Sequence, residues 1–385
     1  MDTKELDKAY IAGTYSRFDV AIKSGKGSIL YGEDGKEYID FGSGIAVNTF
    51  GASDHIWKQA IISQLDKIQH TSNLYYNENG ARLAEILCKR TGMKKVFFSN
   101  SGAEANECAI KVARKYGTDK NPDKNVIITL ENSFHGRTIT TLAATGQDKF
   151  HENFTPFTQG FRYVPANDIA ALYDAIDENV TAIMIETVQG EGGVNVLSQE
   201  FLAEIEKITT QKDILLVIDE VQTGNGRCGA LYSYMKLGLT PDVVSTAKGL
   251  AGGLPMGATM MGDKVENTLT PGTHGSTFGA NPICAAGAIS NMERLDDELF
   301  AQVSEKSEYI KAELLKTDGV KSVSGMGLMM GIETEKPAAE IVKKCVERGL
   351  LVLTAKTKIR LLPPLNIGYE EIDRGLKILK EAICE

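Results

Sequence analysis

Two charged residues end two short apolar runs of the chain. Residues 214–218 (ILLVI) lead into Asp219, and residues 243–247 (VVSTA) lead into Lys248. Such runs suit buried strands of a parallel sheet, and the ligands of open α/β sheets bind where these strands end. An acid and a lysine at that edge suit pyridoxal phosphate, because the amine can condense with the cofactor aldehyde while the carboxylate keeps the pyridine nitrogen protonated. A buried ion pair that only stabilises the fold explains the two residues equally well, so other segments must decide.

A candidate phosphate site lies in residues 99–104 (SNSGAE), between a strand pattern and a helix pattern. Ser101 and Glu104 have the spacing of a capping box, which an ordinary well-capped helix explains fully. Gly102 and Ala103 would also leave bare backbone N–H groups at the helix start, and such groups bind anions. Beside a lysine and an aspartate suited to pyridoxal phosphate, the segment favours a phosphate cup.

Three further side chains could face a ligand. Phe134 follows a strand pattern that ends at Glu131, and an aromatic ring at a strand end can stack on a flat cofactor. Arg137 offers two N–H groups to a carboxylate. Arg360 lies in the apolar, proline-stiffened residues 359–364 (IRLLPP), where it needs a buried partner or a ligand carboxylate. A core aromatic and two surface arginines are the alternative interpretation.

Residues 224–229 (GNGRCG) match the GxGxxG pattern, so a dinucleotide site must be weighed. Residues 219–223 separate the first glycine from the strand, and no clear long helical period follows. Asp242 begins the next strand, whereas a ribose-binding acid should end it. A flexible loop fits these residues better, and a nicotinamide-dependent dehydrogenase stays open as the alternative from another enzyme class.

The elements that would position these residues alternate along the chain. Strand patterns at 94–100, 125–131, 181–187, 214–220 and 242–247 are separated by helical patterns such as 103–116 and 201–213. This alternation predicts an α/β layer structure with a mainly parallel sheet. After about residue 281 a helical stretch, short strands and two further helices predict a smaller α+β domain. We expect an N-terminal segment (1–45) that is part of the small domain, a large cofactor-binding domain (46–280) and a C-terminal small domain (281–385).

The composition excludes several classes of protein. The net charge of −9 over 385 residues argues against a nucleic-acid partner. The first residues are polar and acidic, unlike a secretory signal, and no apolar run approaches the length of a membrane span. Six scattered cysteines without CxxC, and five histidines without metal-ligand spacing, fit a cytoplasmic protein with reduced thiols and no metal site.

Seven segments together resemble the class III (ω-amino acid) aminotransferases of the fold-type I pyridoxal phosphate superfamily. They are SNSGAEANE, SFHGRT, ETVQGEGG, VIDEVQTG, STAKGLAGGLPMGA, GSTFGANP and IRLLPPL, which occur in the family's order. The resemblance runs from Tyr15 to the C-terminal helix. It implies a large domain with a mainly parallel central sheet and a smaller α+β domain.

The resemblance also implies pyridoxal 5′-phosphate as the cofactor and a role for each matching residue. Lys248 would bind the cofactor covalently and move the proton, and Asp219 would pair with the pyridinium nitrogen. Gln222 would bond the phenolic oxygen, and Val221 and Phe134 would cover the two faces of the ring. The other cofactor-binding positions, mostly around the phosphate, would be Ser101, Gly102, Ala103, Ser276 and Thr277. Thr277 would come from the partner subunit, so a homodimer with shared sites is implied.

Six positions match substrate-binding residues of the family: Tyr15, Ile45, Arg137, Glu186, Glu191 and Arg360. An ω-amine donor has no carboxylate beside its reacting carbon, so Glu191 would mask Arg360 while the donor is bound. The acceptor 2-oxoglutarate brings a carboxylate to that place, so Glu191 would then move away. Arg137 would hold the distal carboxylate in both half-reactions.

The resemblance implies transfer of the δ-amino group of N2-acetylornithine to 2-oxoglutarate, a step of arginine synthesis. Relatives that act on ornithine tend to have an aromatic residue where Ile45 stands, and an apolar, roomier wall would tolerate an acyl group. The chain departs from the family at Thr187, often proline, and at residues 51–55 (GASDH), often GHxHP. Ornithine, succinylornithine, N-succinyldiaminopimelate and 4-aminobutyrate therefore stay open as donors. A regulator that keeps this fold as a sensor would need an appended DNA-binding module, for which neither length nor charge leaves room.

Overall fold

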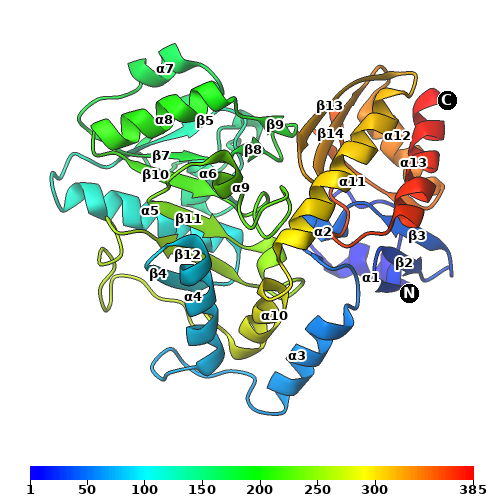
Figure 1. Ribbon diagram of the computed structural model, residues 1–385, viewed down its shortest axis with the longest axis horizontal. Helices are drawn as coiled ribbons and strands as arrows, with labels where there is room; N and C mark the ends of the chain where they lie inside the picture. The colour runs from blue at the N-terminus through cyan, green and yellow to red at the C-terminus, as the bar shows by residue number, and fades with distance from the viewer.

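A seven-stranded sheet forms the larger part of the molecule, on the left of Figure 1, in a computed structural model that describes all 385 residues. Six of its strands run in one direction, and only β12 is antiparallel to its neighbours. In spatial order the strands are β4 (Lys95–Ser99), β12 (Gly257–Met261), β11 (Val243–Thr246), β10 (Leu215–Asp219), β7 (Val180–Ile185), β5 (Val126–Leu130) and β6 (Phe161–Val164). The predicted mainly parallel sheet is confirmed, and its predicted strands lie within two residues of these bounds.

Helices cover both faces of this sheet. Successive residues of β10 alternate between two apolar clusters, with Leu215 and Val217 in one and Leu216 and Ile218 in the other. The first cluster includes the buried face of α5 (Gly102–Thr118), and the second includes that of α8 (Gln199–Gln211). Each such side chain removed from water contributes about 1.5–3 kcal/mol. A strand buried on both faces reads as a continuous apolar run, which is why the sequence revealed it.

Both chain ends lie in the part on the right of Figure 1, where N-terminal and C-terminal strands share a sheet. That sheet contains β1 (Ile22–Lys26), β2 (Ile29–Gly32), β3 (Glu37–Asp40) and β15 (Leu350–Leu351). A second sheet contains β13 (Val320–Met326), β14 (Met329–Thr334), β17 (Lys358–Leu361) and β16 (Leu353–Ala355). The helices of this part are α1 (Thr3–Tyr10), α11 (Asp297–Leu315), α12 (Ala338–Glu347) and α13 (Tyr369–Cys384).

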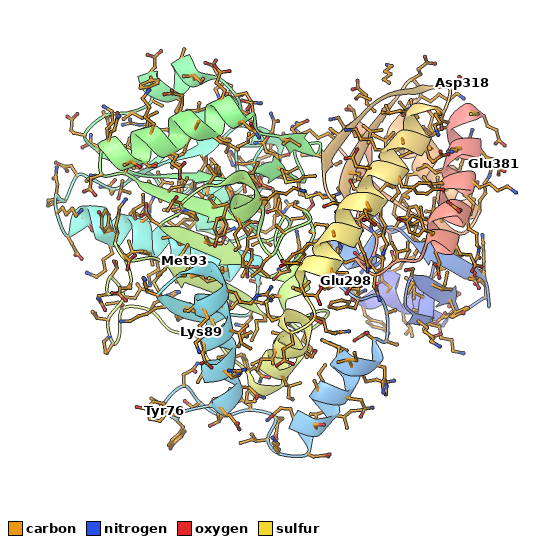
Figure 2. The ribbon with its side chains drawn as sticks, viewed as in Figure 1. Tyr76, Lys89, Met93, Glu298, Asp318 and Glu381 are labelled. Atoms are coloured by element: carbon orange, nitrogen blue, oxygen red, sulfur yellow. The ribbon has the colours of Figure 1, made fainter.

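Three helices project at the lower end of the view, where α10 (Pro282–Met292) packs against α3 (His55–Leu65) and α4 (Glu78–Thr91). Tyr76, in the connection between α3 and α4, points away from the protein, as Figure 2 shows. Asp54 caps the start of α3 and also pairs with Arg294 at 2.8 Å. The remaining elements are short: α2 (Ser43–Ala46), α6 (Ile139–Ala144), α7 (Ile169–Asp174), α9 (Ser233–Leu237), a hairpin of β8 (Val188–Gln189) and β9 (Asn195–Val196), and two 3₁₀ turns. None of the helices combines the length and apolar character needed to cross a membrane.

The GxGxxG loop packs into the protein rather than framing a ligand. At Gly226 an added Cβ would lie 2.7 Å from Leu365 Cδ1, and the glycine has a φ of 88°. The buried Arg227 donates to the carbonyl oxygens of Leu328 (3.1 Å) and Pro363 (2.5 Å). The helix that follows, α9, has only five residues. The glycines therefore serve a turn and close packing, and the loop lacks the helix start that a dinucleotide pyrophosphate needs.

Candidate active site

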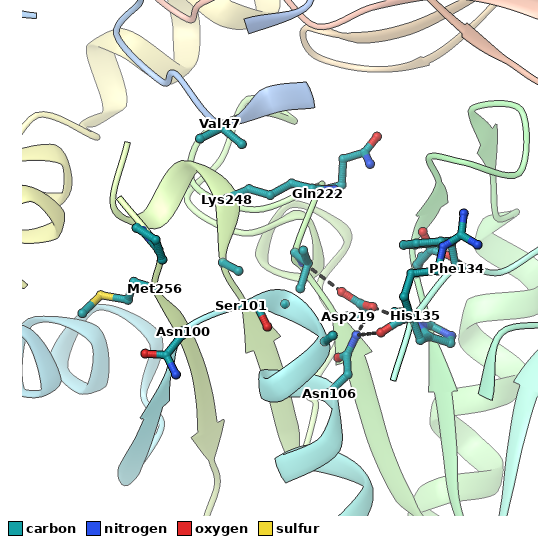
Figure 3. Close-up of a pocket in the computed structure, with 18 of the residues that line it drawn as sticks. Val47, Asn100, Ser101, Asn106, Phe134, His135, Asp219, Gln222, Lys248 and Met256 are labelled. Carbon is teal, nitrogen blue, oxygen red and sulfur yellow. Dashed lines mark hydrogen bonds and ion pairs between the residues drawn. The ribbon is translucent and has the colours of Figure 1, made fainter. Parts of the chain in front are cut away.

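A cavity of about 420 Å³ opens where β4, β5, β10 and β11 end (Figure 3). The sheet brings to it residues that are distant in sequence, as ligand sites of α/β sheets require. Ten predicted site residues line the cavity: Ser101, Gly102, Ala103, Phe134, Arg137, Glu186, Asp219, Val221, Gln222 and Lys248.

Asp219 ends β10 and is held by three donors. Its Oδ1 accepts from the backbone N–H of Val221 at 2.9 Å. Its Oδ2 accepts from Asn106 Nδ2 at 2.7 Å and from His135 Nδ1 at 2.8 Å. Burial opposes protonation of His135, yet the hydrogen bond to Asp219 and its charge raise the pKa of the imidazole above its usual value. The carboxylate is therefore fixed, and its position suits a cationic nitrogen in the cavity.

Helix α5 begins at the cavity with its first N–H groups free. Ser101 Oγ accepts from the N–H of Glu104 at 3.2 Å, and the Glu104 carboxylate accepts from the N–H of Asn100 at 2.7 Å. The predicted cap by Ser101 is thus present, whereas the Glu104 carboxylate bonds the N–H of Asn100 rather than that of Ser101, so the predicted capping box is not closed. A Cβ at Gly102 would lie 2.6 Å from the side chain of Val221, so only glycine lets the helix start approach so closely. The unpaired N–H groups of Gly102 and Ala103 suit a phosphate.

Lys248 lies at the end of β11 with a left-handed φ of 45°. Burial lowers the pKa of its amine, although the charges of Glu191 and Asp219 oppose this shift. Asn225 holds the preceding residues, because its Nδ2 donates to Thr246 Oγ1 at 3.0 Å and to the carbonyl oxygen of Ala247 at 3.1 Å. A strained lysine with a lowered pKa suits a nucleophilic amine.

Phe134 reaches the cavity from the loop after β5, and Glu186 holds its backbone. Glu186 Oε2 accepts from the N–H of Phe134 at 3.0 Å, and Oε1 accepts from the N–H of Gly190 at 3.4 Å. Burial raises the pKa of Glu186 to about 7. The guanidinium of Arg137 lies over the ring of Phe150 at 3.9 Å, and it stays exposed to solvent at the cavity. It is thus open to a ligand carboxylate.

Arg360 and Glu191 form an ion pair next to the cavity. Gln222, which lines the cavity, forms hydrogen bonds with both of them. Arg360 Nη1 donates to Glu191 Oε1 at 2.6 Å and to Gln222 Oε1 at 3.1 Å, while Gln222 Nε2 donates to Glu191 Oε1 at 3.2 Å. Burial favours the neutral carboxyl, but the charge of Arg360 outweighs it and holds the pKa of Glu191 below its usual range. Arg360 Nε is buried without a hydrogen-bond partner. That unused donor suits a carboxylate that takes the place of Glu191.

Besides Glu191 and Arg360, four predicted site residues do not line the cavity of the single chain. Tyr15 is exposed in the N-terminal segment, and Ile45 is exposed with a left-handed φ of 65°. Thr277 is exposed in the loop before α10, whereas Ser276 is half-buried and accepts from Asn100 Nδ2 at 3.3 Å through its hydroxyl. The single chain therefore lacks part of the predicted site.

Three polar residues of the cavity were missed by sequence reasoning: Asn100, Asn106 and His135. Asn106 and His135 both line it and both bond Asp219. Asparagine is unfavourable inside a helix, so a fully buried Asn106 on α5 conflicts with local propensity. Such conflicts mark functional positions, and this one could have identified Asn106. Thr187 stands where relatives often have proline. Its Oγ1 forms a hydrogen bond with Ser233 Oγ at 2.5 Å, and the residue does not line the cavity.

The residues present fit pyridoxal phosphate. The free N–H groups at α5 suit its phosphate, the Asp219 carboxylate suits its protonated ring nitrogen, and Lys248 suits its aldehyde. The close approach of Gly102 to Val221 leaves a cradle that a Cβ would fill.

Comparison with known proteins agrees with this chemistry. Residues 10–383 match the family model described as aminotransferase class-III. The chain is 50% identical over 386 residues to the acetylornithine aminotransferase of Haemophilus ducreyi, covering 99% of this chain and 98% of that protein. Among solved structures, an N-acetylornithine aminotransferase from Stenotrophomonas maltophilia has 36% identity and a TM-score of 0.86, with 99% and 98% of the two chains covered. An ornithine aminotransferase from Toxoplasma gondii has 31% identity and a TM-score of 0.95, with 100% and 96% covered.

Proposed function

This chain belongs to the class-III aminotransferase family, and on that premise we propose that it moves the δ-amino group of N2-acetylornithine to 2-oxoglutarate. It is a transaminase that uses pyridoxal phosphate. The products are N-acetylglutamate semialdehyde and glutamate, which places the reaction in arginine synthesis. The observation that carries the proposal is the masked arginine: Arg360 is paired with Glu191 beside a cavity that ends in Lys248 and Asp219.

When bound, the cofactor supplies an electron sink that lowers the energy of the carbanion at the reacting carbon. Asp219 would hold the proton on the ring nitrogen through a charge-assisted hydrogen bond. The Lys248 amine, with its lowered pKa, would be the group that takes and returns the proton at the reacting carbon. Gln222 would bond the phenolic oxygen, and Phe134 and Val221 would hold the ring between them.

Two arginines select the substrates. Arg137 binds the carboxylate far from the reacting carbon, which both the donor and 2-oxoglutarate carry. Arg360 binds the carboxylate next to the reacting carbon, which only 2-oxoglutarate and glutamate carry. Glu191 neutralises Arg360 while the amine donor is bound, so one site serves two substrates of different charge.

The donor is distinguished at the mouth of the site. N2-acetylornithine carries a neutral, partly apolar acetamide where ornithine carries an ammonium group. Ile45 is exposed and apolar, which suits the acetyl group and offers no partner to a second charge. We propose that Tyr15 completes the wall that Ile45 forms.

We further propose a cytoplasmic homodimer in which Thr277 and Ser276 contribute to the phosphate site, Thr277 from the neighbouring subunit. An exposed apolar surface supports this assembly, since large side chains lie open in the α3–α4 connection and the loop before α10: Ile68, Leu74, Tyr75, Tyr76 and Phe278. Such a surface is unusual on a monomer. The proposed domains are 46–280 for the cofactor and 281–385 with 1–45 for the small domain, a division supported by the sheet of β1, β2, β3 and β15.

The proposed donor is tested by measuring kcat/KM for a panel of amine donors with 2-oxoglutarate. N2-acetylornithine should give the highest kcat/KM, ahead of succinylornithine, ornithine, N-succinyldiaminopimelate and 4-aminobutyrate. Lys248→Ala should abolish turnover with every donor while the protein stays folded, which controls for a contaminating enzyme. A higher kcat/KM for ornithine or 4-aminobutyrate would keep the chemistry and overturn the donor.

A further inference from the structure

We propose that Asn106 is a positioning residue that, together with Ser245, fixes the carboxylate of Asp219 toward the cofactor. The inference rests on the proposed function, because it concerns the groove in which pyridoxal phosphate would bind. It extends the machinery to a side chain that needs no contact with the substrate. The geometry that carries it is a continuous chain of buried hydrogen bonds.

This series of hydrogen bonds begins on β11 and ends at Asp219. Ser245 Oγ donates to Asn106 Oδ1 at 2.6 Å. Asn106 Nδ2 then donates to Asp219 Oδ2 at 2.7 Å and to the carbonyl oxygen of His135 at 2.8 Å. All four residues are buried, with at most 3% of each exposed. The partners of Nδ2 settle the orientation of the amide, because the Asp219 carboxylate and the His135 carbonyl oxygen can only accept, which leaves Oδ1 to accept from Ser245. Figure 3 shows Asn106, Asp219 and His135 joined in this way.

The bonds leave a defined place on Asp219 for a further donor. Each carboxylate oxygen accepts about two hydrogen bonds. Oδ2 already accepts two, from Asn106 and His135, whereas Oδ1 accepts only one, from the N–H of Val221. The remaining acceptor site is therefore on Oδ1, and Asp219 lines the cavity. Without Asn106, the carboxylate could rotate and offer either oxygen in several orientations.

The position of Asn106 on α5 couples this bond to the phosphate end of the cavity. Gly102 and Asn106 are four residues apart on one helix, so they lie on one face, one turn apart. The first turn offers its N–H groups to the phosphate, and the second turn holds the acid that faces the ring nitrogen. A single rigid helix face thus contributes to holding both ends of the cofactor.

A purely structural role for Asn106 would bring together α5, β11 and the loop at His135. Thr259 offers a matched control for that role, because its buried hydroxyl donates to the carbonyl oxygen of Ala105, the neighbour of Asn106, at 2.7 Å. Thr259→Val removes this bond from the same helix and leaves Asp219 untouched. Asn106→Leu keeps the size of the side chain and removes its hydrogen bonds, and Ser245→Ala removes only the bond that β11 makes to Asn106 Oδ1.

The experiment uses full-length protein, with the cofactor removed and then restored. Two quantities are measured: the dissociation constant of pyridoxal phosphate from the apoprotein, and the ¹⁵N chemical shift of cofactor labelled at its ring nitrogen. Asn106→Leu should weaken cofactor binding about tenfold or more, the ratio that corresponds to one charge-assisted hydrogen bond. Its ¹⁵N signal should move toward that of the unprotonated ring, and Ser245→Ala should change both quantities in the same direction by less. Thr259→Val should lower the melting temperature and leave both quantities at the wild-type values.

A structural role cannot move the ring-nitrogen signal in this pattern. If Asn106→Leu keeps the wild-type dissociation constant and ¹⁵N shift while its melting temperature falls, the inference is overturned. If Asn106→Leu does not accumulate as folded protein, Ser245→Ala decides by the same two measurements. A wild-type apoprotein that binds no pyridoxal phosphate would instead overturn the proposed function, so the two failures are distinct.

Discussion

Arg360 and Glu191 meet in a two-point ion pair, with Nη1 to Oε1 at 2.6 Å and Nη2 to Oε2 at 3.3 Å. The arginine side chain is 3% exposed and the glutamate side chain 29%. Arg360 is fixed on β17 and also bonds Gln222, whereas Glu191 lies in the turn between β8 and β9. Glu191 is therefore the partner of the pair that can move away. An arginine left buried and unpaired costs several kcal/mol, so its exchange of Glu191 for a ligand carboxylate is coupled to substrate binding.

Glu191→Ala should affect the two half-reactions in opposite ways. The glutamate half-reaction should persist or accelerate, because Arg360 is always open to its α-carboxylate. The half-reaction with N2-acetylornithine should slow about tenfold or more, since an unmasked arginine favours binding the donor by its carboxylate in the wrong direction. Arg360→Ala should damage mainly the glutamate side. Single-turnover kinetics of each half-reaction measures these rates.

Glu191→Gln is the matched control for this pair. It keeps the length of the side chain and one acceptor for Arg360, but it removes the negative charge. It should resemble Glu191→Ala in the donor half-reaction if charge masks the arginine, and wild type if only space is filled. Equal losses in both half-reactions for all variants would mean that the pair only supports the fold.

Ile45 lies in a left-handed turn that β-branched residues avoid. Ser43, Ile45 and Ala46 have φ of 42°, 65° and 61°, and each such residue costs about 1–2 kcal/mol relative to right-handed backbone. Ile45→Gly should therefore raise the free energy of unfolding above that of Ile45→Ala by about 1 kcal/mol, because only glycine relieves the strain. Chemical denaturation measures this difference.

The same two variants separate the backbone of Ile45 from its side chain in substrate selection. Both remove the apolar wall, so both should lower the ratio of kcat/KM for N2-acetylornithine over ornithine by a similar factor. A ratio that stays at the wild-type value in both variants would place the acetyl group elsewhere and remove Ile45 from the site.

Glu186 should make the apoprotein less stable as the pH rises. Burial raises the pKa of this carboxyl to about 7, above its ordinary value of 4.5, so the folded state binds the proton more tightly than the unfolded chain. The stability from this group is complete below the unfolded pKa and is lost as the pH rises through the folded pKa. Glu186→Gln should therefore gain stability relative to wild type between about pH 5 and pH 8, by on the order of 1 kcal/mol or more. Urea unfolding of both proteins at the two pH values measures this. If the difference in their free energy of unfolding is the same at both pH values, Glu186 does not carry a proton in the folded state.

The sequence could reveal Asp219 and Lys248 because each follows a run of residues buried on both faces of one sheet. The strand ends are local features, and the parallel arrangement brings them to one edge. β12 was not predicted, because residues 257–261 (GATMM) have little strand propensity and take their place from pairing with β4 and β11.

Contacts between distant segments lie beyond such reasoning. The bond from Asn106 to Asp219 joins residues 113 positions apart, and the ion pair of Arg360 with Glu191 joins residues 169 apart. Periodicity and turn chemistry describe neighbours in sequence, so they cannot supply these pairs. The GxGxxG loop is the converse case, because its glycines match a ligand motif while their surroundings require them for packing against Leu365.

Thr277 should act across the subunit boundary. It is exposed in the loop before α10, outside the cavity of its own chain, and its hydroxyl is proposed to donate to the phosphate in the neighbouring site. Thr277→Ala should weaken cofactor binding about tenfold or more, since one charge-assisted hydrogen bond is lost. Thr277→Ser keeps the hydroxyl and should retain most of the affinity. Titration of the apoprotein with pyridoxal phosphate measures both, and sedimentation equilibrium should give the mass of a dimer.

Hybrid dimers decide whether Thr277 acts on its own site or its neighbour's. A Lys248→Ala chain and a Thr277→Ala chain, carrying different tags, are co-expressed and the mixed dimer is purified. If Thr277 acts in trans, one site of this dimer combines both defects, while the other has Lys248 and an intact threonine from its neighbour. That site should bind the cofactor with wild-type affinity and give half the wild-type activity per dimer. If Thr277 acts in cis, the only site with Lys248 still lacks its threonine, so the hybrid would show the weakened affinity of Thr277→Ala and the shared site would be ruled out.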